Sequence, residues 1–445
     1  MNITYENLKK ELKFIISLAF VFILFSNVNA FANTNPPKTL GRGMVLMDGK
    51  TGQILAEKNA NEKMAPASTT KTMTAILTIE KCNLNDVVTI GKNPPFADGT
   101  RVGLQEGDKY TVEQLLNAML VQSANDAAMA LAEHISGSEA NFTKLMNEKA
   151  KEIGCTNTHF VNSSGLYEDD HYTTPHDLAL IVNYASKMPK LCEITRKIVY
   201  EMPKSVVSGE PIWANNNDQI IHKTSKYYYK DIIYSKTGYT TKSKHTFACA
   251  AKRGDRTLIL TLFYYDTKEQ YYEEVKPLLD YGFNNFVEEK IYSKGDIAKE
   301  YFINDKNTLK LIVPEDIYMV FPKEEVKNLS IPEIRSKEHI QFTVKSNTPI
   351  SRGTDLTKNK SNFTGTIMIG NTPYKSISLL NGNNITTSKF EKIMIKLQSF
   401  KGFYITLTIV SLVALVILIL FIIRIVSSIK RFRNRKKRNN TYFYK

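Results

Sequence analysis

Cysteine and histidine are both scarce in this chain of 445 residues. The four cysteines lie far apart and form no CxxC pair, so their spacing demands no disulfide. The seven histidines include no HxH or HxxxH pair, and His171 and His176 lie off a common helical face. The sequence therefore lacks the ligand pairs of a zinc site, and we expect no metal and no cofactor.

Acidic residues are absent from the tail Arg424–Lys445, which carries nine positive charges. The first 32 residues add a net charge of +1, so only about +5 of the formal +15 belongs to the residues between these two ends. The excess of positive charge is therefore a signal of the tail's membrane topology, and we expect no nucleic-acid partner.

Two long apolar runs stand near the ends of the chain. Residues 14–25 follow three lysines and precede the small residues of 28–32, which predicts a signal peptide over 1–32. Residues 403–423 carry no charge and are long enough to span a membrane, and the basic tail 424–445 follows them. Because basic segments stay in the cytoplasm, we expect a single-pass protein of the cell membrane whose preceding part is extracytoplasmic.

The residues between the apolar runs predict an α+β fold. Two strands over 43–57 and helices over 139–153 and 175–185 precede three strands from Lys226 and a last helix from Lys268. This order predicts an antiparallel sheet flanked by helices, with a helical subdomain, over 33–288. Short alternating segments predict a small all-β domain over 289–385, and residues 386–402 are expected to link it to the membrane.

Three short motifs carry candidate chemistry. Ser-X-X-Lys occurs at Ser68/Lys71 and at Ser427/Lys430, and Lys-Thr-Gly occurs at Lys50 and at Lys236. Ser-X-Asn occurs once, over 123–125. Each pattern is weak alone, but together they supply what acyl transfer by a serine requires: a nucleophile, a base, a proton relay and electrostatic stabilisation.

A lysine can be the base only if its pKa falls well below ~10.4. Burial, a neighbouring cation and the positive end of a helix all lower it. Ser68 and Lys71 are one turn apart at a predicted helix start, and a second lysine near them supplies the cation. Lys50 lies in a predicted turn, whereas Lys236 lies in a predicted strand that can face a cleft, so we favour Lys236.

The chain from about Leu40 to Phe286 resembles the serine-type D-alanyl-D-alanine carboxypeptidases, the low-molecular-mass penicillin-binding proteins. The resemblance rests on the three motifs in order and on the wider text PASTTKTMTA, LLNAMLVQSANDAAMALAEHI, HFVNSSGLYEDDHYTTPHDLA and LLDYGF. It implies a β-lactamase/transpeptidase-like fold, a peptidoglycan pentapeptide substrate and inhibition by β-lactams.

The resemblance also implies roles for individual residues. Ser68 would attack the bond between two terminal D-alanines, Lys71 would take its proton, and Ser123 would relay a proton to the leaving D-alanine. The substrate-binding residues would be Asn125, Lys236, Thr237, Gly238 and Tyr239, with backbone N–H groups of Ser68 and Tyr239 as the oxyanion hole.

Two alternative functions stay open from sequence alone. A β-lactamase-like hydrolase shares the motifs but would need a glutamate-bearing loop such as ExxLN, and none occurs between Asn125 and Lys236. A catalytically silent wall-binding protein on the same fold is the second alternative. The chain also departs from the family pattern, because Tyr271 stands where relatives usually have a carboxylate-binding arginine, and Lys268 lies one helical turn earlier.

Overall fold

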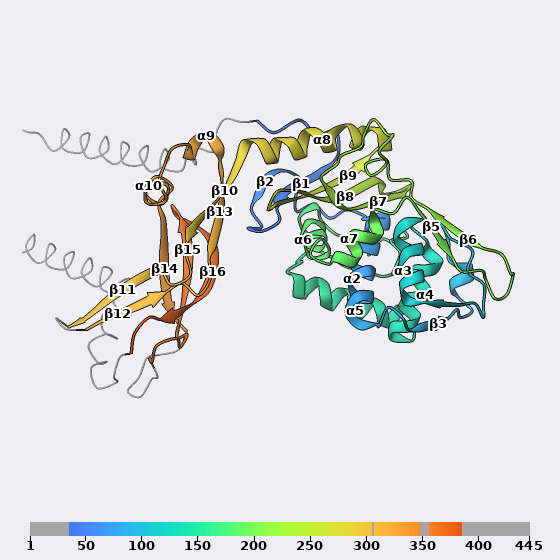
Figure 1. The fold of residues 1–445 in the computed structure, drawn as a ribbon, viewed down its shortest axis with the longest axis horizontal. Helices are drawn as coiled ribbons and strands as arrows, with labels where there is room; N and C mark the ends of the chain where they lie inside the picture. The colour runs from blue at the N-terminus through green and yellow to red at the C-terminus, as the bar shows by residue number, and fades with distance from the viewer. Residues whose placement is uncertain (1–34, 305–306, 348–355, 385–445) are drawn as a thin grey trace, which may run out of the picture. The chain divides into compact units, whose positions relative to one another are not determined.

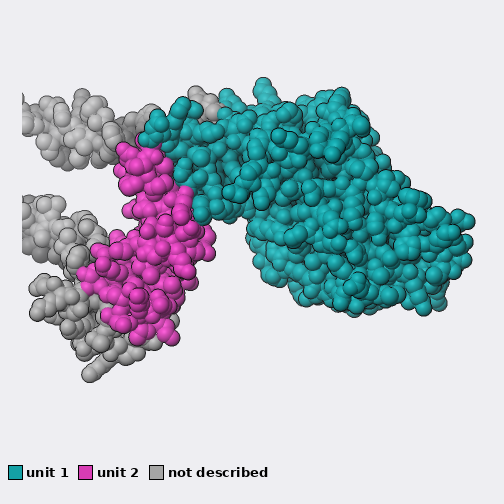
Figure 2. All heavy atoms as spheres, viewed as in Figure 1, with its two compact units in different colours: residues 1–289, 318–328 teal, residues 290–317, 329–445 magenta. Residues whose placement is uncertain are grey.

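The computed structural model describes residues 35–304, 307–347 and 356–384. The predicted signal peptide, transmembrane segment and basic tail lie outside these ranges. Within them, no helix is both long and apolar enough to cross a membrane. The chain divides into two compact units, residues 1–289 with 318–328 and residues 290–317 with 329–445, coloured separately in Figure 2.

An antiparallel five-stranded sheet forms the centre of the first unit, with the strand order β2-β1-β9-β8-β7 (Figure 1). The strands are β1 (Gly43–Asp48), β2 (Ile54–Lys58), β7 (Ile232–Thr240), β8 (Lys244–Arg253) and β9 (Arg256–Tyr265). Strands β1, β8 and β9 are apolar on both faces because successive side chains point to opposite sides and both sides are covered. The prediction of an antiparallel sheet flanked by helices is confirmed.

The helical subdomain covers one face of this sheet. It comprises α2 (Lys71–Lys81), α3 (Val112–Val121), α4 (Asn125–Ser136), α5 (Glu139–Ile153), α6 (Pro175–Ala185) and α7 (Pro189–Thr195). Short elements join these helices: η1 (Ala67–Thr70), η2 (Pro94–Phe96), the ribbon of β3 (Val87–Thr89) with β4 (Lys109–Thr111), and the ribbon of β5 (Val199–Met202) with β6 (Ile212–Asn215).

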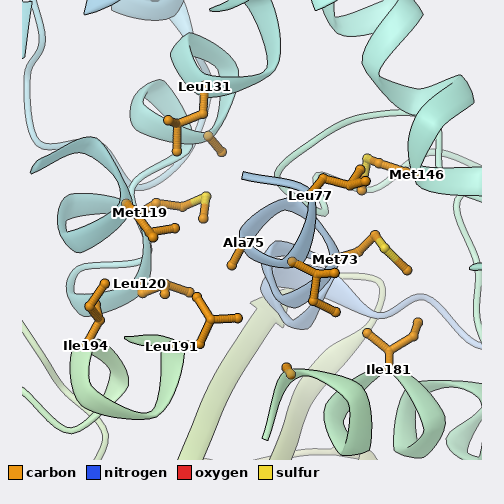
Figure 3. Packing of buried hydrophobic residues seen from close by; sticks show 14 of the residues in the cluster. Met73, Ala75, Leu77, Met119, Leu120, Leu131, Met146, Ile181, Leu191 and Ile194 are labelled. Atoms are coloured by element: carbon orange, nitrogen blue, oxygen red, sulfur yellow. The ribbon is translucent and has the colours of Figure 1, made fainter. Parts of the chain in front are cut away.

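Helix α2 lies at the centre of the subdomain, enclosed by its neighbours (Figure 3). Every residue from Lys71 to Thr78 is buried, and Met73, Ala75 and Leu77 belong to the same apolar cluster as side chains of α3–α7. A helix buried on all sides has little freedom to shift, because interiors are packed as densely as organic crystals. It therefore gives whatever stands at its first turn a fixed position.

Helix α8 (Lys268–Asn285) covers the other face of the sheet. A capping box formed by Thr267 and Gln270 starts it, and its apolar side packs on the alternate residues of β1, β8 and β9. The predicted helices over 139–153 and 175–185 coincide with α5 and α6. The helix expected to open at Ser68 instead starts as the 3-10 turn η1 and becomes α-helical at Lys71.

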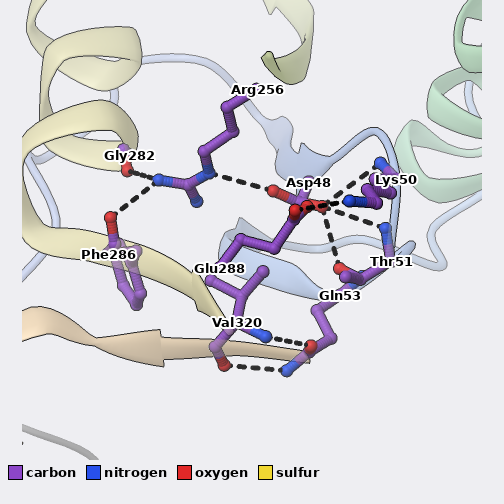
Figure 4. A network of polar contacts seen from close by, with 9 residues as sticks. All are labelled: Asp48, Lys50, Thr51, Gln53, Arg256, Gly282, Phe286, Glu288 and Val320. Carbon is purple, nitrogen blue, oxygen red and sulfur yellow. Dashed lines mark hydrogen bonds and ion pairs between the residues drawn. The ribbon is translucent and has the colours of Figure 1, made fainter. Parts of the chain in front are cut away.

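A polar network joins the end of β1 to the end of α8 (Figure 4). The buried Asp48 carboxylate accepts a 3.1 Å hydrogen bond from Arg256 Nε, and Arg256 also donates to the carbonyls of Gly282 and Phe286. A guanidinium at the last turn satisfies carbonyls that the helix itself leaves free. Gln53 pairs with the backbone of Val320 through both amide atoms.

The second unit is mainly β. Its five-stranded sheet has the order β11-β12-β16-β15-β14, and its strands are β11 (Ile297–Asn304), β12 (Asn307–Ile312), β14 (Ile340–Ser346), β15 (Phe363–Ile369) and β16 (Thr372–Asn381). Helix α10 (Ile331–Lys337) belongs to it, and β10 (Phe286–Tyr292) leads the chain into it. Strand β13 (Ile317–Pro322) and α9 (Lys323–Val326) lie almost wholly in the stretch 318–328, which returns to the first unit.

Candidate active site

The first site element is the turn η1 that precedes α2. Ser68 is half-buried there, and Lys71 is fully buried one turn later. Lys71 Nζ donates a 3.0 Å hydrogen bond to Ser68 Oγ and a 2.8 Å hydrogen bond to the carbonyl of Ser164. The spacing of three residues at a helix start puts both side chains on one face, as the sequence predicted.

The loop that carries Ser164 is a part of the site that sequence reasoning did not single out, although the stretch VNSSGL was visible in the family resemblance. In this loop the carbonyl of Ser163 accepts a 2.6 Å hydrogen bond from Thr74 Oγ1. The successive carbonyls of Ser163 and Ser164 therefore both anchor α2. Gly165 has a φ of +88°, and a Cβ there would lie 1.8 Å from the carbonyl oxygen of Ala67. Only glycine allows the loop this close to η1.

The Ser-X-Asn motif occupies the break between α3 and α4. Ser123 has a φ of +66°, an uncommon conformation for a residue other than glycine, and its Oγ accepts a 2.9 Å hydrogen bond from Lys236 Nζ. Asn125 begins α4, and its Nδ2 donates to the carbonyl of Asp98. Its Oδ1 is buried, and among the described residues it has no hydrogen-bond partner.

Strand β7 brings the Lys-Thr-Gly motif against η1. Because β7 is an edge strand of the sheet, one side of its backbone pairs with no other strand in the part of the chain that the structure describes. A Cβ on Gly238 would lie 2.9 Å from the backbone nitrogen of Ser68 and 2.3 Å from Thr246 Oγ1. Thr246 in turn donates a 2.8 Å hydrogen bond to the carbonyl of Pro66, so strand and turn are in close contact at the glycine.

The two lysines of the site have lowered pKa values. Burial lowers the pKa of Lys71 well below its ordinary value, the nearby charge of Lys236 lowers it further, and Asp126 opposes both. Burial also lowers the pKa of Lys236, to about 8, against the opposing charge of Asp218. Both lysines of the site therefore hold their protons less tightly than an exposed lysine does, and Lys236, near Ser123, titrates at about pH 8.

A pocket of about 280 Å³ lies in front of these residues. Its lining brings together Ser68, Ser123, Lys236, Thr237, Gly238 and Tyr239. Lys71 and Asn125 do not line the pocket. Lys71 is covered by Ser68 and by the loop that carries Ser164, and the side chain of Asn125 points toward Asp98.

The pocket also includes residues of β8 and α8: His245, Lys268, Tyr271 and Tyr272. The Tyr271 ring is buried and stacks on Phe247, with the ring centroids 5.1 Å apart. Tyr271, at the position where relatives usually have a carboxylate-binding arginine, and Lys268, one helical turn earlier, therefore both line the pocket.

The first copy of Lys-Thr-Gly does not reach this site. Lys50 lies in the turn between β1 and β2, and its Nζ donates to Glu288. The second Ser-X-X-Lys copy, at Ser427, lies outside the described residues. Within the described ranges, no group of three or more His, Cys, Asp or Glu side chains is placed to hold a metal ion.

Comparison with known proteins agrees with this architecture. A family model described as D-alanyl-D-alanine carboxypeptidase matches residues 30–267, and one described as penicillin-binding protein 5, C-terminal domain, matches residues 286–385. The chain is 31% identical over 348 residues to the D-alanyl-D-alanine carboxypeptidase DacF of Bacillus subtilis, a match that covers 76% of this chain and 86% of the relative.

Solved structures show the same fold. Penicillin-binding protein 5 from Haemophilus influenzae matches with a TM-score of 0.63 at 26% identity, over 80% of this chain and 100% of that chain. A D-alanyl-D-alanine carboxypeptidase from Mycobacterium tuberculosis matches with a TM-score of 0.52 at 32% identity, over 57% of this chain and 94% of that chain.

The fold is thus the transpeptidase-like fold of the low-molecular-mass penicillin-binding proteins, followed by their C-terminal all-β domain. The chain belongs to the D-alanyl-D-alanine carboxypeptidase family and is a serine peptidase.

Proposed function

We propose that this carboxypeptidase removes the terminal D-alanine from peptidoglycan stem pentapeptides through an acyl-enzyme on Ser68. The observation that carries the proposal is the 3.0 Å contact between Lys71 Nζ and Ser68 Oγ, with Lys71 fully buried. Burial and the charge of Lys236 lower the pKa of Lys71, which favours the neutral amine that can accept the Ser68 proton. This is the activation that a serine nucleophile requires.

Acylation follows from the same contacts. Ser68 Oγ bonds to the carbonyl carbon of the penultimate D-alanine as its proton passes to Lys71 Nζ. The oxyanion accepts hydrogen bonds from the backbone N–H groups of Ser68 and Tyr239, which the close approach of β7 to η1 at Gly238 supports. Ser123 Oγ, which accepts a hydrogen bond from Lys236, relays the proton taken up by Lys71 to the leaving amine as the C–N bond breaks, so that Lys71 and Ser123 both return to their starting protonation states. Water then hydrolyses the ester and restores Ser68.

The substrate lies along the free edge of β7 in this proposal. An extended peptide can pair with an edge strand through main-chain hydrogen bonds. Asn125, two residues after the pocket-lining Ser123, would hold a substrate amide group, and Thr237 offers a hydroxyl to the terminal carboxylate. β-Lactams would acylate Ser68 as analogues of the D-alanyl-D-alanine terminus.

We also propose that the enzyme is a bitopic membrane protein. Its signal peptide would be residues 1–32, its anchor residues 403–423, and its cytoplasmic tail residues 424–445. The uncharged run and the nine following positive charges support this topology. Protease added to intact spheroplasts should remove the catalytic part and spare an epitope tag after Lys445. Loss of the tag would overturn this orientation.

Penicillin labelling tests the catalytic proposal. Mass spectrometry of digested adduct should place the label on the peptide PASTTK, which contains Ser68, and Lys71→Ala should abolish labelling. Lys63→Ala, on the exposed surface of the same segment, is the matched control and should label normally. A label on another peptide would refute the assignment of the nucleophile. Rapid release of the drug would instead favour a β-lactamase, and folded protein that never labels would favour a silent wall-binding protein.

A further inference from the structure

A buried carboxylate lines the catalytic pocket without a part in the proposed reaction. Asp218 is 4% exposed and lies on the loop between β6 and β7. Its Oδ2 accepts a 2.6 Å hydrogen bond from Ser235 Oγ, and its Oδ1 accepts a 2.9 Å hydrogen bond from the Tyr272 hydroxyl. The backbone N–H of Ile220 donates to Oδ1 at 3.2 Å. Burying such a group is costly unless it is fully partnered, so the carboxylate needs an explanation.

The donors around Asp218 favour its charged form. The backbone N–H of Gln219 donates to the Tyr272 oxygen, which directs the Tyr272 proton toward Asp218. Burial raises the pKa of Asp218, while hydrogen bonds from Ser235, Ile220 and Tyr272 and the charge of Lys236 oppose that rise. Hydrogen bonds to a carboxylate stabilise its ionised state, so these three donors and the charge of Lys236 favour the charged form of Asp218 that burial opposes.

Lys236 is the cation that this charge affects. Its Nζ donates to Ser123 Oγ and to the carbonyl of Thr237, and among the described residues no carboxylate oxygen is in ion-pair contact with it. Asp218 is connected to it through Ser235, the preceding residue of β7. Burial lowers the pKa of Lys236 to about 8, and the charge of Asp218 opposes that fall.

Other ionisable groups surround Lys236 on every element packed against it. They are Lys71 on α2, Asp126 on α4, Tyr239 on β7, His245 and Cys249 on β8, and Lys268, Tyr271 and Tyr272 on α8. The two tyrosines and the cysteine have raised pKa values, so they are neutral at the pH at which the enzyme would work. Asp126 acts on Lys71, which leaves Asp218 as the acid that favours a charged Lys236.

We propose that Asp218 is a positioning residue that keeps Lys236 protonated and thereby sets the upper pH limit of acylation. This inference rests on the proposed function, in which Lys236 holds the proton relay Ser123 and depresses the basicity of Lys71. A protonated Lys236 is present below its pKa and lost above it. Acylation should therefore fall as the pH rises through about 8.

Asp218→Asn tests the proposal, because it keeps the shape of the side chain and removes the charge. The rate of β-lactam acylation at pH 6 should stay within about twofold of the native rate, since Lys236 is protonated in both proteins. The fall of the acylation rate at high pH, here called the upper limb of the pH profile, should move about one pH unit toward acid. This shift lowers the rate about fivefold at pH 8. A variant whose profile is lowered equally at every pH would show a merely structural role and overturn the proposal.

Asp108→Asn is the matched control. Asp108 is equally buried and accepts hydrogen bonds from Ser205 Oγ and two backbone N–H groups, but it does not line the pocket. Its substitution should leave the upper limb in place, and a similar shift would show that the effect is not specific to Asp218. Asp218→Glu keeps the charge and should retain the native limb even if its rate is lower.

Lys236→Arg keeps the test decisive if Asp218→Asn does not fold. A guanidinium stays protonated, so the fall above pH 8 should disappear, and a limb that persists would assign the ionisation to another group and overturn the proposal. Labelling of Ser68 at pH 6 separates the two levels of inference. Native protein without label would refute the proposed function itself, whereas normal labelling with an unshifted limb in Asp218→Asn would refute only the role of Asp218.

Discussion

The chain contains the tripeptide Lys-Thr-Gly twice, and the two copies have opposite environments. The first, Lys50–Gly52, forms the turn between β1 and β2, where the Asp48 carboxylate accepts hydrogen bonds from the two residues that follow Gly49. Gly52 has a φ of +73°, and a Cβ there would meet nothing within 4 Å. The second copy, Lys236–Gly238, lies in an edge strand, with its lysine 3% exposed and its glycine against η1.

The comparison shows that the same three residues form a backbone turn in one place and line a pocket in the other. In the turn, glycine is needed for its left-handed conformation, and the lysine side chain reaches the surface to contact Glu288. In the strand, glycine is needed because no side chain fits between β7 and Ser68, and the lysine is buried with a lowered pKa. The aspartates near the two copies differ in the same way. Asp48, beside the first copy, stabilises the fold, whereas Asp218, near the second copy, lines the pocket.

The largest expected difference is between the two lysines. Lys236→Ala should lower the acylation rate by about 10²–10³-fold, because it removes the charge and the donor that hold Ser123. Lys50→Ala should change the rate less than about twofold, since an exposed ion pair contributes about 0–1 kcal/mol to stability. Stopped-flow acylation by a chromogenic β-lactam measures both. Comparable losses in the two variants would contradict the assignment of function to the strand copy.

The two glycines should differ next. Gly238→Ala places a methyl group 2.9 Å from the Ser68 nitrogen, so β7 or η1 must shift, and a displacement near 1 Å costs about 10²-fold in rate. Gly52→Ala should leave the rate unchanged and cost about 1 kcal/mol of stability through its positive φ. Acylation kinetics and thermal unfolding by circular dichroism separate these effects. Normal acylation by Gly238→Ala would show that the close contact is not needed for catalysis.

The aspartate of the turn should affect stability alone. Asp48→Asn leaves Arg256 without its buried charged partner, and breaking such a pair costs about 3 kcal/mol. Urea unfolding followed by circular dichroism gives the free energy, and the pH profile of acylation should keep its native upper limb. A shifted limb in Asp48→Asn would remove the contrast with Asp218.

The smallest expected change concerns the α8 residues that line the same pocket as Lys236. Tyr271→Arg should raise kcat/KM for a diacetyl-Lys-D-Ala-D-Ala peptide about tenfold, because a guanidinium makes a charge-assisted hydrogen bond with the terminal carboxylate that a phenol lacks. Lys268→Ala serves as the comparison, since Lys268 lines the same pocket. No gain from Tyr271→Arg, together with a large loss from Lys268→Ala, would assign the carboxylate to Lys268.

Much of the fold was predictable from local patterns. Helices α5 and α6 and the strands on both sides of the Asp48 turn follow from periodicity and from capping and turn residues, which act over a few neighbouring positions. The ribbons β3–β4 and β5–β6 were not predicted, because strands of three or four residues give too short a pattern. The 3-10 turn at Ser68 was likewise hidden, since its conformation depends on contacts with Gly165 and Thr246.

The sequence by itself determined the chemistry available to this protein: the serine and lysine one turn apart, the separate Ser-X-Asn and Lys-Thr-Gly motifs, and the family they indicate. The tertiary structure placed in the pocket the copy of Lys-Thr-Gly that the sequence had favoured. It alone decided that the carbonyl of Ser164 anchors Lys71 and that Asp218 lies buried near Lys236. The physical reason is that burial and long-range charge set a pKa. Both depend on segments distant in sequence, such as α2, β7 and the loop at Asp218, being packed together.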